Sequence, residues 1–192
     1  MKTSTPILRK KNFMSTALLI IDVQQALCSG EGAAFESQRV IERINLVSRK
    51  AREAGATVVV IQHESQSGPL GYGTDGWKLA DGLDTKPTDI CLRKKASDSF
   101  HGTDLHAVLQ ARGVTRLVIC GLQSEFCVDT TTRRALALGY PVTLVSDGHS
   151  TMNNSVLCAA QITAHHNETL ANLTSFGPRV NAVPASEVQI EA

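Results

Sequence analysis

The chain alternates short apolar runs, rich in β-branched residues, with longer segments of helical character. Apolar runs without polar alternation are typical of strands buried on both faces, as in a parallel sheet. The expected strands are 17–21, 57–62, 90–93, 116–120 and 141–145, with a short sixth near 179–183. The expected helices are 37–54, 104–112, 128–138 and 155–173. This strand–helix repetition predicts a doubly wound α/β domain.

Three glycines, Gly55, Gly113 and Gly139, stand where helices should end and can supply the left-handed residue found there. We expect one domain over residues 15–192, preceded by an N-terminal tail over residues 1–14. The tail is basic but has no apolar run of the kind found in secretory signals. The longest strongly apolar run, 17–21, is far shorter than the roughly 20 residues that span a bilayer. A cytoplasmic location is therefore expected.

The composition argues against several kinds of partner. Lys and Arg number 19 and Asp and Glu 18, so the charge of +1 offers no attraction to nucleic acid or to an anionic membrane. Aromatic residues make up only 4% of the chain, too few for stacking on single-stranded nucleic acid. We therefore expect a small-molecule substrate, with no nucleic acid and no membrane as partner.

The five cysteines are an odd number without a Cys-x-x-Cys pair, so they indicate neither a zinc ribbon nor a disulfide framework. They are Cys28, Cys91, Cys120, Cys127 and Cys158. Unpaired thiols in such a chain are usually buried as small apolar residues. Cys91 and Cys120 fall within expected strands and are interpreted as buried structural residues. One of the remaining thiols could be a nucleophile.

Ligands of doubly wound sheets bind beyond the carboxyl ends of the strands, so chemistry is sought there. The residues that follow the expected strands are Asp22, 62–64, Lys94 and Lys95, 121–127 and 147–149. Taken singly, each has a structural explanation, since an acid after a strand often caps a turn and a lysine is usually solvated.

Cys127 is less easily explained as structural, because it lies where a buried strand turns into a helix. A helix N-terminus favours the thiolate, and its amides can hold an oxyanion. Asp22 could accept the thiol proton if burial raises the pKa of its carboxyl. Lys94 could then offset the negative charges. Asp22, Lys94 and Cys127, which follow three different strands, would then form one catalytic site.

Three segments resemble motifs of the isochorismatase-like cysteine hydrolases. Residues 18–24, LLIIDVQ, resemble the opening strand; residues 93–105, RKKASDSFHGTDL, resemble the lysine motif; residues 121–131, GLQSEFCVDTT, resemble the nucleophile motif. The resemblance covers roughly residues 16–183. It implies an α/β fold with a doubly wound, six-stranded, mainly parallel sheet and helices on both faces.

The resemblance also implies a catalytic triad of Asp22, Lys94 and Cys127. Lys94 is preferred over Lys95 because the lysine of the family stands six residues before a phenylalanine, here Phe100. The implied chemistry is hydrolysis of a C–N bond in an amide, carbamoyl or cyclic amide substrate through a thioester. Two alternatives stay open, namely a vinyl ether hydrolase of the isochorismatase type and a non-catalytic binding or scaffold protein.

Family members have a cis peptide before the nucleophile turn, which maps to Leu122–Gln123 in this chain. This geometry would direct the backbone N–H groups of Gln123 and Cys127 into an oxyanion hole. The family also generally forms dimers or larger assemblies. The resemblance therefore implies a homodimer or homotetramer in which one subunit approaches the pocket of another.

Metal-dependent nicotinamidases in the family carry an Asp-x-His and further histidines after the second strand. Residues 62–65 of this chain read Gln-His-Glu-Ser, so no metal and no other cofactor is expected. The long glycine-rich connection 63–89 is expected to shape the substrate site. The candidate pocket residues are Gln24, His63, Trp77, Phe100 and Phe126. No role is assigned to Cys28, Cys158 or the pair His165 and His166.

Overall fold

The computed structural model describes residues 15–191, and the proposed N-terminal tail lies outside them. The strands are β1 (Ser15–Ile21), β2 (Thr57–His63), β3 (Ile90–Lys94), β4 (Val114–Leu122), β5 (Val142–Ser150) and β6 (Val180–Val183). The α-helices are α1 (Gln25–Cys28), α2 (Ser37–Glu53), α3 (Leu105–Ala111), α4 (Asp129–Ala137) and α5 (Ala159–Ala171). Short 3-10 and π-helical segments are η1 (Gly30–Gly32) and η2 (Ser124–Val128). The predicted α/β architecture is confirmed.

The six strands form one sheet in the order β3-β2-β1-β4-β5-β6, and all neighbouring strands are parallel. The chain winds outward from β1 to β3 and then from β4 to β6 on the other side. The direction of winding therefore changes between β1 and β4. Doubly wound sheets bind ligands at this switch point, beyond the carboxyl ends of the strands.

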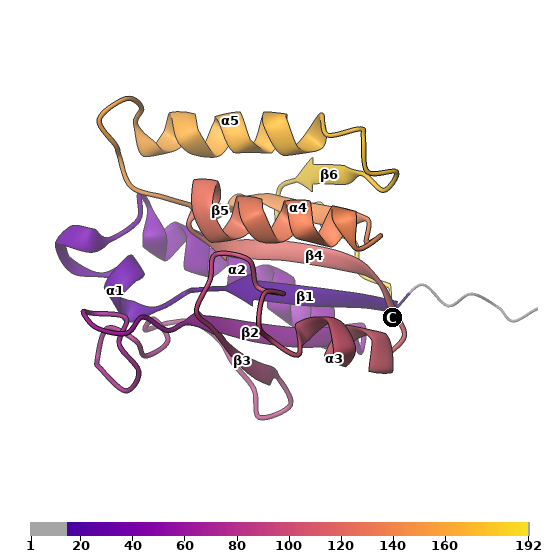
Figure 1. The fold of residues 1–192 in the computed structure, drawn as a ribbon, viewed down its shortest axis with the longest axis horizontal. Coiled ribbons are helices and arrows are strands. Elements are labelled where there is room, and N and C mark those ends of the chain that lie inside the picture. Colours follow the sequence, from indigo (N-terminus) through magenta and orange to yellow (C-terminus); the bar gives the residue numbers. More distant parts are fainter. Residues whose placement is uncertain (1–14, 192) are drawn as a thin grey trace, which may run out of the picture.

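Helices cover both faces of the sheet (Figure 1). Each face packs against its helices through a separate apolar layer. Leu18 and Ile20 of β1 pack with the apolar face of α2, which includes Ile44. Leu19 and Ile21 belong to the opposite layer, with residues of α3, α4 and α5. Successive side chains of a strand point to opposite faces, so a continuous apolar run serves both layers.

Gly121 allows the ends of the two central strands to approach closely. Its φ is +123°, and it is in register with Ile21 of β1. A Cβ at this position would overlap the backbone carbonyl of Ile21, so only glycine fits. The close approach brings together the segments that follow β1 and β4.

Strand β5 continues to Ser150, beyond the expected end at Val145. Leu144 pairs with Ile119 and His149 pairs with Gly121, so residues 145–148 lie opposite the single residue Cys120. The expectation that residues 147–149 follow the strand is therefore wrong. A bulge of this kind interrupts the apolar pattern while the strand goes on pairing.

All five cysteines are free. Cys120 is fully buried in β4, as predicted. The prediction that Cys91 is buried is wrong, because β3 lies at the sheet edge and alternates partly buried residues with the exposed Cys91 and Arg93. Within residues 15–191, no helix is long and apolar enough to cross a membrane.

Candidate active site

Asp22 and Lys94 form a buried ion pair at the carboxyl edge of the sheet. Asp22 follows β1 in a left-handed conformation with φ +52°, and its N–H donates to the carbonyl of Ile61 at 2.8 Å. Lys94 is the last residue of β3, and its side chain crosses the end of β2 to reach Asp22. Its Nζ lies 2.7 Å from Asp22 Oδ2, and neither side chain is more than 1% exposed.

The same ammonium contacts three further acceptors. Lys94 Nζ lies 3.1 Å from Cys127 Sγ, 3.0 Å from the carbonyl oxygen of Ala96 and 3.5 Å from His63 Nδ1. The structure thus brings Asp22, Lys94 and Cys127 together, although they lie in three separate parts of the sequence. Lysine is the residue that links the carboxylate to the thiol.

Cys127 lies inside the π-helical segment η2, whereas the sequence predicted that it begins a helix. Burial raises the pKa of the Cys127 thiol to about 12; the Asp22 carboxylate adds to the rise and the Lys94 ammonium opposes it. Burial and the Asp22 charge thus disfavour the thiolate, while the Lys94 ammonium favours it. This rise in pKa favours the protonated thiol near neutral pH, so the reaction calls for a group that accepts its proton.

Asp22 is placed to receive that proton. Burial raises the pKa of its carboxyl, and the adjacent Lys94 ammonium opposes this rise. Asp22 Oδ2 accepts from Lys94, whereas Oδ1 is buried and, apart from the neighbouring Cys127 thiol, which lowers the pKa of the carboxyl, has no hydrogen-bond partner among residues 15–191. A buried carboxylate oxygen that faces the thiol and does not bond Lys94 is a suitable proton acceptor.

The structure places His63, one of the predicted pocket residues, next to Lys94. Burial lowers the pKa of its imidazole, and the Lys94 charge lowers it further. Ligand atoms of Asp22, His63 and Cys127 lie within 4.8 Å of one another, a grouping that could hold a metal ion. Lys94 Nζ already lies within 3.5 Å of all three side chains. The positive charge at this point is therefore the ammonium itself.

Gln24 is fully buried and connects three segments, and its predicted pocket role stays a prediction. Its Nε2 donates to the carbonyls of His63 at 3.0 Å and Trp77 at 2.8 Å, and its Oε1 accepts from the His63 N–H at 2.8 Å. Gln62 Nε2 also donates to the Trp77 carbonyl, at 2.9 Å. The two glutamines thus hold the long loop against the end of β2.

The three aromatic pocket candidates lie in different surroundings. Phe100 is 8% exposed and packs in the core, with its ring centroid 6.4 Å from that of Tyr140, and its pocket role stays a prediction. Trp77 is partly buried and contacts Tyr72 edge to face. Phe126 is 53% exposed and directly precedes Cys127, and its pocket role stays a prediction.

The peptide bond between Leu122 and Gln123 is cis and leads from β4 into η2. Gln123 is half-buried and comes directly before the first residue of that segment. The backbone at Gln123 and Cys127 therefore belongs to one short turn. Their assignment to an oxyanion hole stays a prediction.

Two buried hydroxyls that the sequence pattern does not single out hold the segment after β3. Ser99 Oγ lies 2.9 Å from Thr131 Oγ1 of α4, which also accepts from the Ser99 N–H at 3.1 Å. Both residues have no exposed surface. Ser99 lies within the segment that resembles the lysine motif, and that resemblance is the signal by which it could be found.

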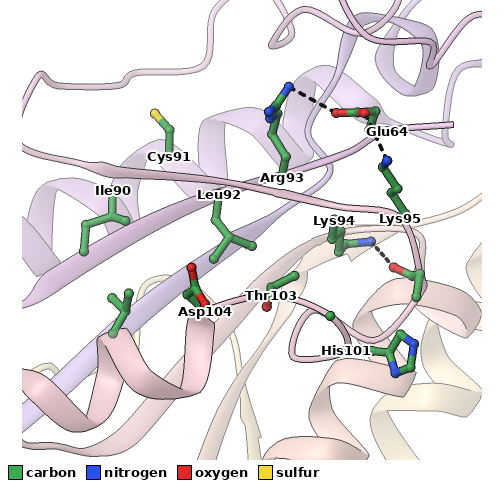
Figure 2. Close-up of a pocket in the computed structure, with 13 residues that line it drawn as sticks. Glu64, Ile90, Cys91, Leu92, Arg93, Lys94, Lys95, His101, Thr103 and Asp104 are labelled. Carbon is green, nitrogen blue, oxygen red and sulfur yellow. Dashed lines mark hydrogen bonds and ion pairs between the residues drawn. The ribbon is translucent and has the colours of Figure 1, made fainter. Parts of the chain in front are cut away.

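A cavity of about 800 Å³ opens beside edge strand β3, as Figure 2 shows. Lys94 contributes to its wall, but Asp22 and Cys127 do not. Glu64 at its rim pairs with Arg93 at 3.3 Å and with Lys95 at 3.8 Å. Lys95 is 79% exposed and pairs with Glu64, whereas Lys94 is buried and pairs with Asp22.

Comparisons with known proteins identify the family. The sequence matches the Isochorismatase domain over residues 16–179. It is 38% identical over 176 residues to the streptothricin hydrolase of Streptomyces noursei, an alignment that covers 88% of this chain and 64% of that protein. It is 30% identical over 170 residues to the ureidoacrylate amidohydrolase RutB of Caulobacter vibrioides, covering 69% of this chain and 76% of that one.

A crystal structure of an isochorismatase family protein superposes with a TM-score of 0.80 and 36% identity, covering 90% of this chain and 98% of that one. The chain spans a little under two thirds of the length of the streptothricin hydrolase. The family match, the relatives and the fold agree. The chain belongs to the isochorismatase family of hydrolases.

Proposed function

We propose that this protein hydrolyses a C–N bond in a small amide, carbamoyl or cyclic amide substrate through a thioester on Cys127. One observation carries the proposal: the Lys94 ammonium contacts both the Asp22 carboxylate and the Cys127 sulfur, and the Asp22 carboxylate itself faces the Cys127 thiol. The similarity to an enzyme named as an amidohydrolase supports amide chemistry.

In the first step, Asp22 Oδ1 takes the Cys127 proton while the sulfur attacks the carbonyl carbon. The transfer accompanies the attack because burial raises the pKa of the thiol and so disfavours a thiolate formed beforehand. The new C–S bond converts the carbonyl oxygen to an oxyanion, which the Gln123 and Cys127 N–H groups would stabilise. Lys94 offsets the negative charge near Asp22 throughout.

In the second step, Asp22 returns the proton to the substrate nitrogen, the C–N bond breaks and the amine leaves. A water molecule then gives one proton to Asp22 and attacks the thioester carbon. The C–S bond breaks, the sulfur recovers the proton from Asp22 and the carboxylic acid is released. The net reaction consumes one water molecule and restores all three side chains.

A panel of carboxamides, N-carbamoyl amino acids, cyclic imides and one vinyl ether tests the proposal. We expect turnover of an amide or carbamoyl compound and a mass increase of the intact protein that maps to Cys127. Cys120→Ser, which alters a buried thiol in β4, is the matched control and should retain turnover. Turnover of the vinyl ether alone would favour isochorismatase-type chemistry. Binding without turnover of any compound would favour a scaffold role.

We also propose that the protein forms a homo-oligomer, since several large apolar side chains near the site are exposed. Phe35, Phe126 and Met152 are 50%, 53% and 36% exposed. They gather around Thr151, whose carbonyl accepts from the Phe35 N–H at 2.7 Å and whose hydroxyl donates to Glu125 at 2.8 Å. Light scattering should give a multiple of 20.6 kDa, and the monomer mass would contradict the proposal.

A further inference from the structure

The bulge in β5 brings a buried histidine to the carboxyl edge of the sheet. His149 pairs with Gly121, two residues before Gln123, and is only 2% exposed. Gly148 lies so close to Val145 that a Cβ there would be 2.6 Å from Val145 Cγ1, so the tight bulge requires glycine. Bulges next to active sites commonly redirect one side chain. Here the side chain turned toward the site is His149.

His149 is the centre of a chain of hydrogen bonds from α5 to the turn that carries Cys127. Its Nδ1 lies 2.8 Å from Ser124 Oγ, and its Nε2 lies 2.9 Å from Asn167 Oδ1. Ser124 Oγ also lies 3.2 Å from Thr163 Oγ1. Thr163 and Asn167 are four residues apart on α5 and therefore share one face of that helix.

The donor and the acceptor in each of these hydrogen bonds can be assigned from the other contacts of Asn167 and His149. Asn167 Nδ2 donates to the carbonyl of Ser146 at 2.9 Å, so the amide oxygen of Asn167 faces His149 and can only accept. His149 Nε2 therefore carries a proton. Burial lowers the pKa of His149 to about 4, which leaves the ring neutral and Nδ1 unprotonated near neutral pH. Ser124 must then donate its hydroxyl proton to Nδ1.

Ser124 is the first residue of η2 and has no exposed surface. It lies between Gln123 and Cys127, the two residues whose backbone would form the oxyanion hole. A fixed hydroxyl at this point fixes the position of the whole turn relative to β5 and α5. Catalytic groups displaced by about 1 Å can lose on the order of 100-fold in rate, so such anchoring has a kinetic consequence.

We propose that His149 is a positioning residue: by accepting a hydrogen bond from Ser124, it holds η2, the turn that contains Cys127, in the position required for reaction. The inference rests on the proposed function, because it gives the turn a catalytic role. It assigns a purpose to the Ser124–His149–Asn167 chain, which takes no part in the proton transfers of Asp22. The acceptor at Nδ1 is the essential feature, and the donor at Nε2 only orients the ring.

Two substitutions separate these roles. In His149→Asn, the amide oxygen can stand near the former Nδ1 and accept from Ser124, but the contact to Asn167 is lost. In His149→Gln, the longer amide can reach Asn167 as Nε2 did, but the acceptor for Ser124 is lost. Both remove an aromatic ring from the same buried site, so a purely structural effect would be similar in the two variants.

The probe is p-nitrophenyl acetate, whose nitrophenolate release measures acylation, with the acetyl group located on Cys127 by peptide mass spectrometry. We expect His149→Gln and Ser124→Ala to acylate Cys127 roughly 10- to 100-fold more slowly, with a small change in KM. His149→Asn should recover most of the rate. The double variant Ser124→Ala/His149→Gln should be no slower than either single variant, because both remove one interaction.

His106→Gln is the matched control, because His106 also bonds a partner through Nδ1, Tyr140 Oη at 3.1 Å, but on α3, outside this chain of contacts. It should leave the acylation rate unchanged. Equal rates in His149→Asn, His149→Gln and wild type, with Cys127 acetylated in each, would overturn the positioning role alone. Absence of acetyl-Cys127 in the wild type would instead overturn the proposed nucleophile.

Discussion

Lys94 places its ammonium 2.7 Å from a carboxylate oxygen of Asp22, and both side chains are at most 1% exposed. A buried ion pair gains little stability over apolar packing, but removal of one partner leaves an unpaired charge in the interior. The pair therefore serves the proposed chemistry rather than stability, since the same ammonium also contacts the Cys127 sulfur at 3.1 Å. The two charges therefore depend on each other for both stability and chemistry.

Lys94→Met tests this dependence. The variant leaves the Asp22 charge buried without its partner, so the free energy of unfolding should fall by about 3–5 kcal/mol. Turnover should fall as well. Adding Asp22→Asn should recover much of the stability and none of the activity. Chemical denaturation measures the first effect and the amide panel the second.

Lys95→Met is the control for that substitution. The Lys95 side chain is 79% exposed and lies 3.8 Å from Glu64, so its removal should change stability by less than about 1 kcal/mol and leave turnover intact. Equal effects of the two lysine variants would contradict the assignment of Lys94.

The stability of the fold should depend on pH through His149. Burial lowers the pKa of His149 from 6.5 to about 4; the His166 charge adds a smaller lowering, whereas the contacts with Asn167 and Asp147 oppose it. Above pH 6.5 the imidazole is neutral in both the folded and the unfolded chain, and its contribution to stability is fully present. As the pH falls from 6.5 to 4, the unfolded chain binds a proton that the folded chain does not, and stability is lost.

The loss over this range corresponds to roughly 3 kcal/mol. Urea titrations between pH 7 and pH 4 should show the decline in wild type and a shallower slope in His149→Asn. Parallel slopes for the two proteins would show that His149 does not carry this part of the pH dependence.

Removal of metal ions should not reduce activity. The ligand atoms of Asp22, His63 and Cys127 surround the Lys94 ammonium, which supplies the positive charge that a metal would bring. After dialysis against EDTA and elemental analysis of the protein, turnover of the panel substrate should equal that of the untreated enzyme. Loss of turnover that added zinc restores would contradict this reading of the site.

The effect on stability of replacing Cys120 or Cys91 should depend on how deeply each thiol is buried. Cys120 has no exposed surface, so Cys120→Ser places a hydroxyl in the core and should cost about 1–3 kcal/mol of stability without loss of turnover. Cys91→Ser should be neutral, since Cys91 is exposed on β3. Thermal melts compare the two, and a larger loss for Cys91→Ser would contradict the exposed position.

The strands and helices were predictable because continuous apolar runs and helix-ending glycines depend on local sequence. The exposure of Cys91 was not, since no local pattern shows which strand lies at the sheet edge. The bulge before His149 also escaped prediction, because it depends on the pairing of β5 with β4. The resemblance located Asp22, Lys94 and Cys127, but the raised thiol pKa arises from burial that only the folded chain creates.

Turnover by Cys127→Ser tests the central claim most directly. Serine keeps nearly the same shape, but its hydroxyl is a much weaker nucleophile that Asp22 cannot deprotonate well. With folding checked by thermal melts and binding by calorimetry, the account predicts that turnover of the panel substrate falls by several orders of magnitude while binding persists. A folded Cys127→Ser enzyme that hydrolyses the substrate at nearly the wild-type rate would contradict it.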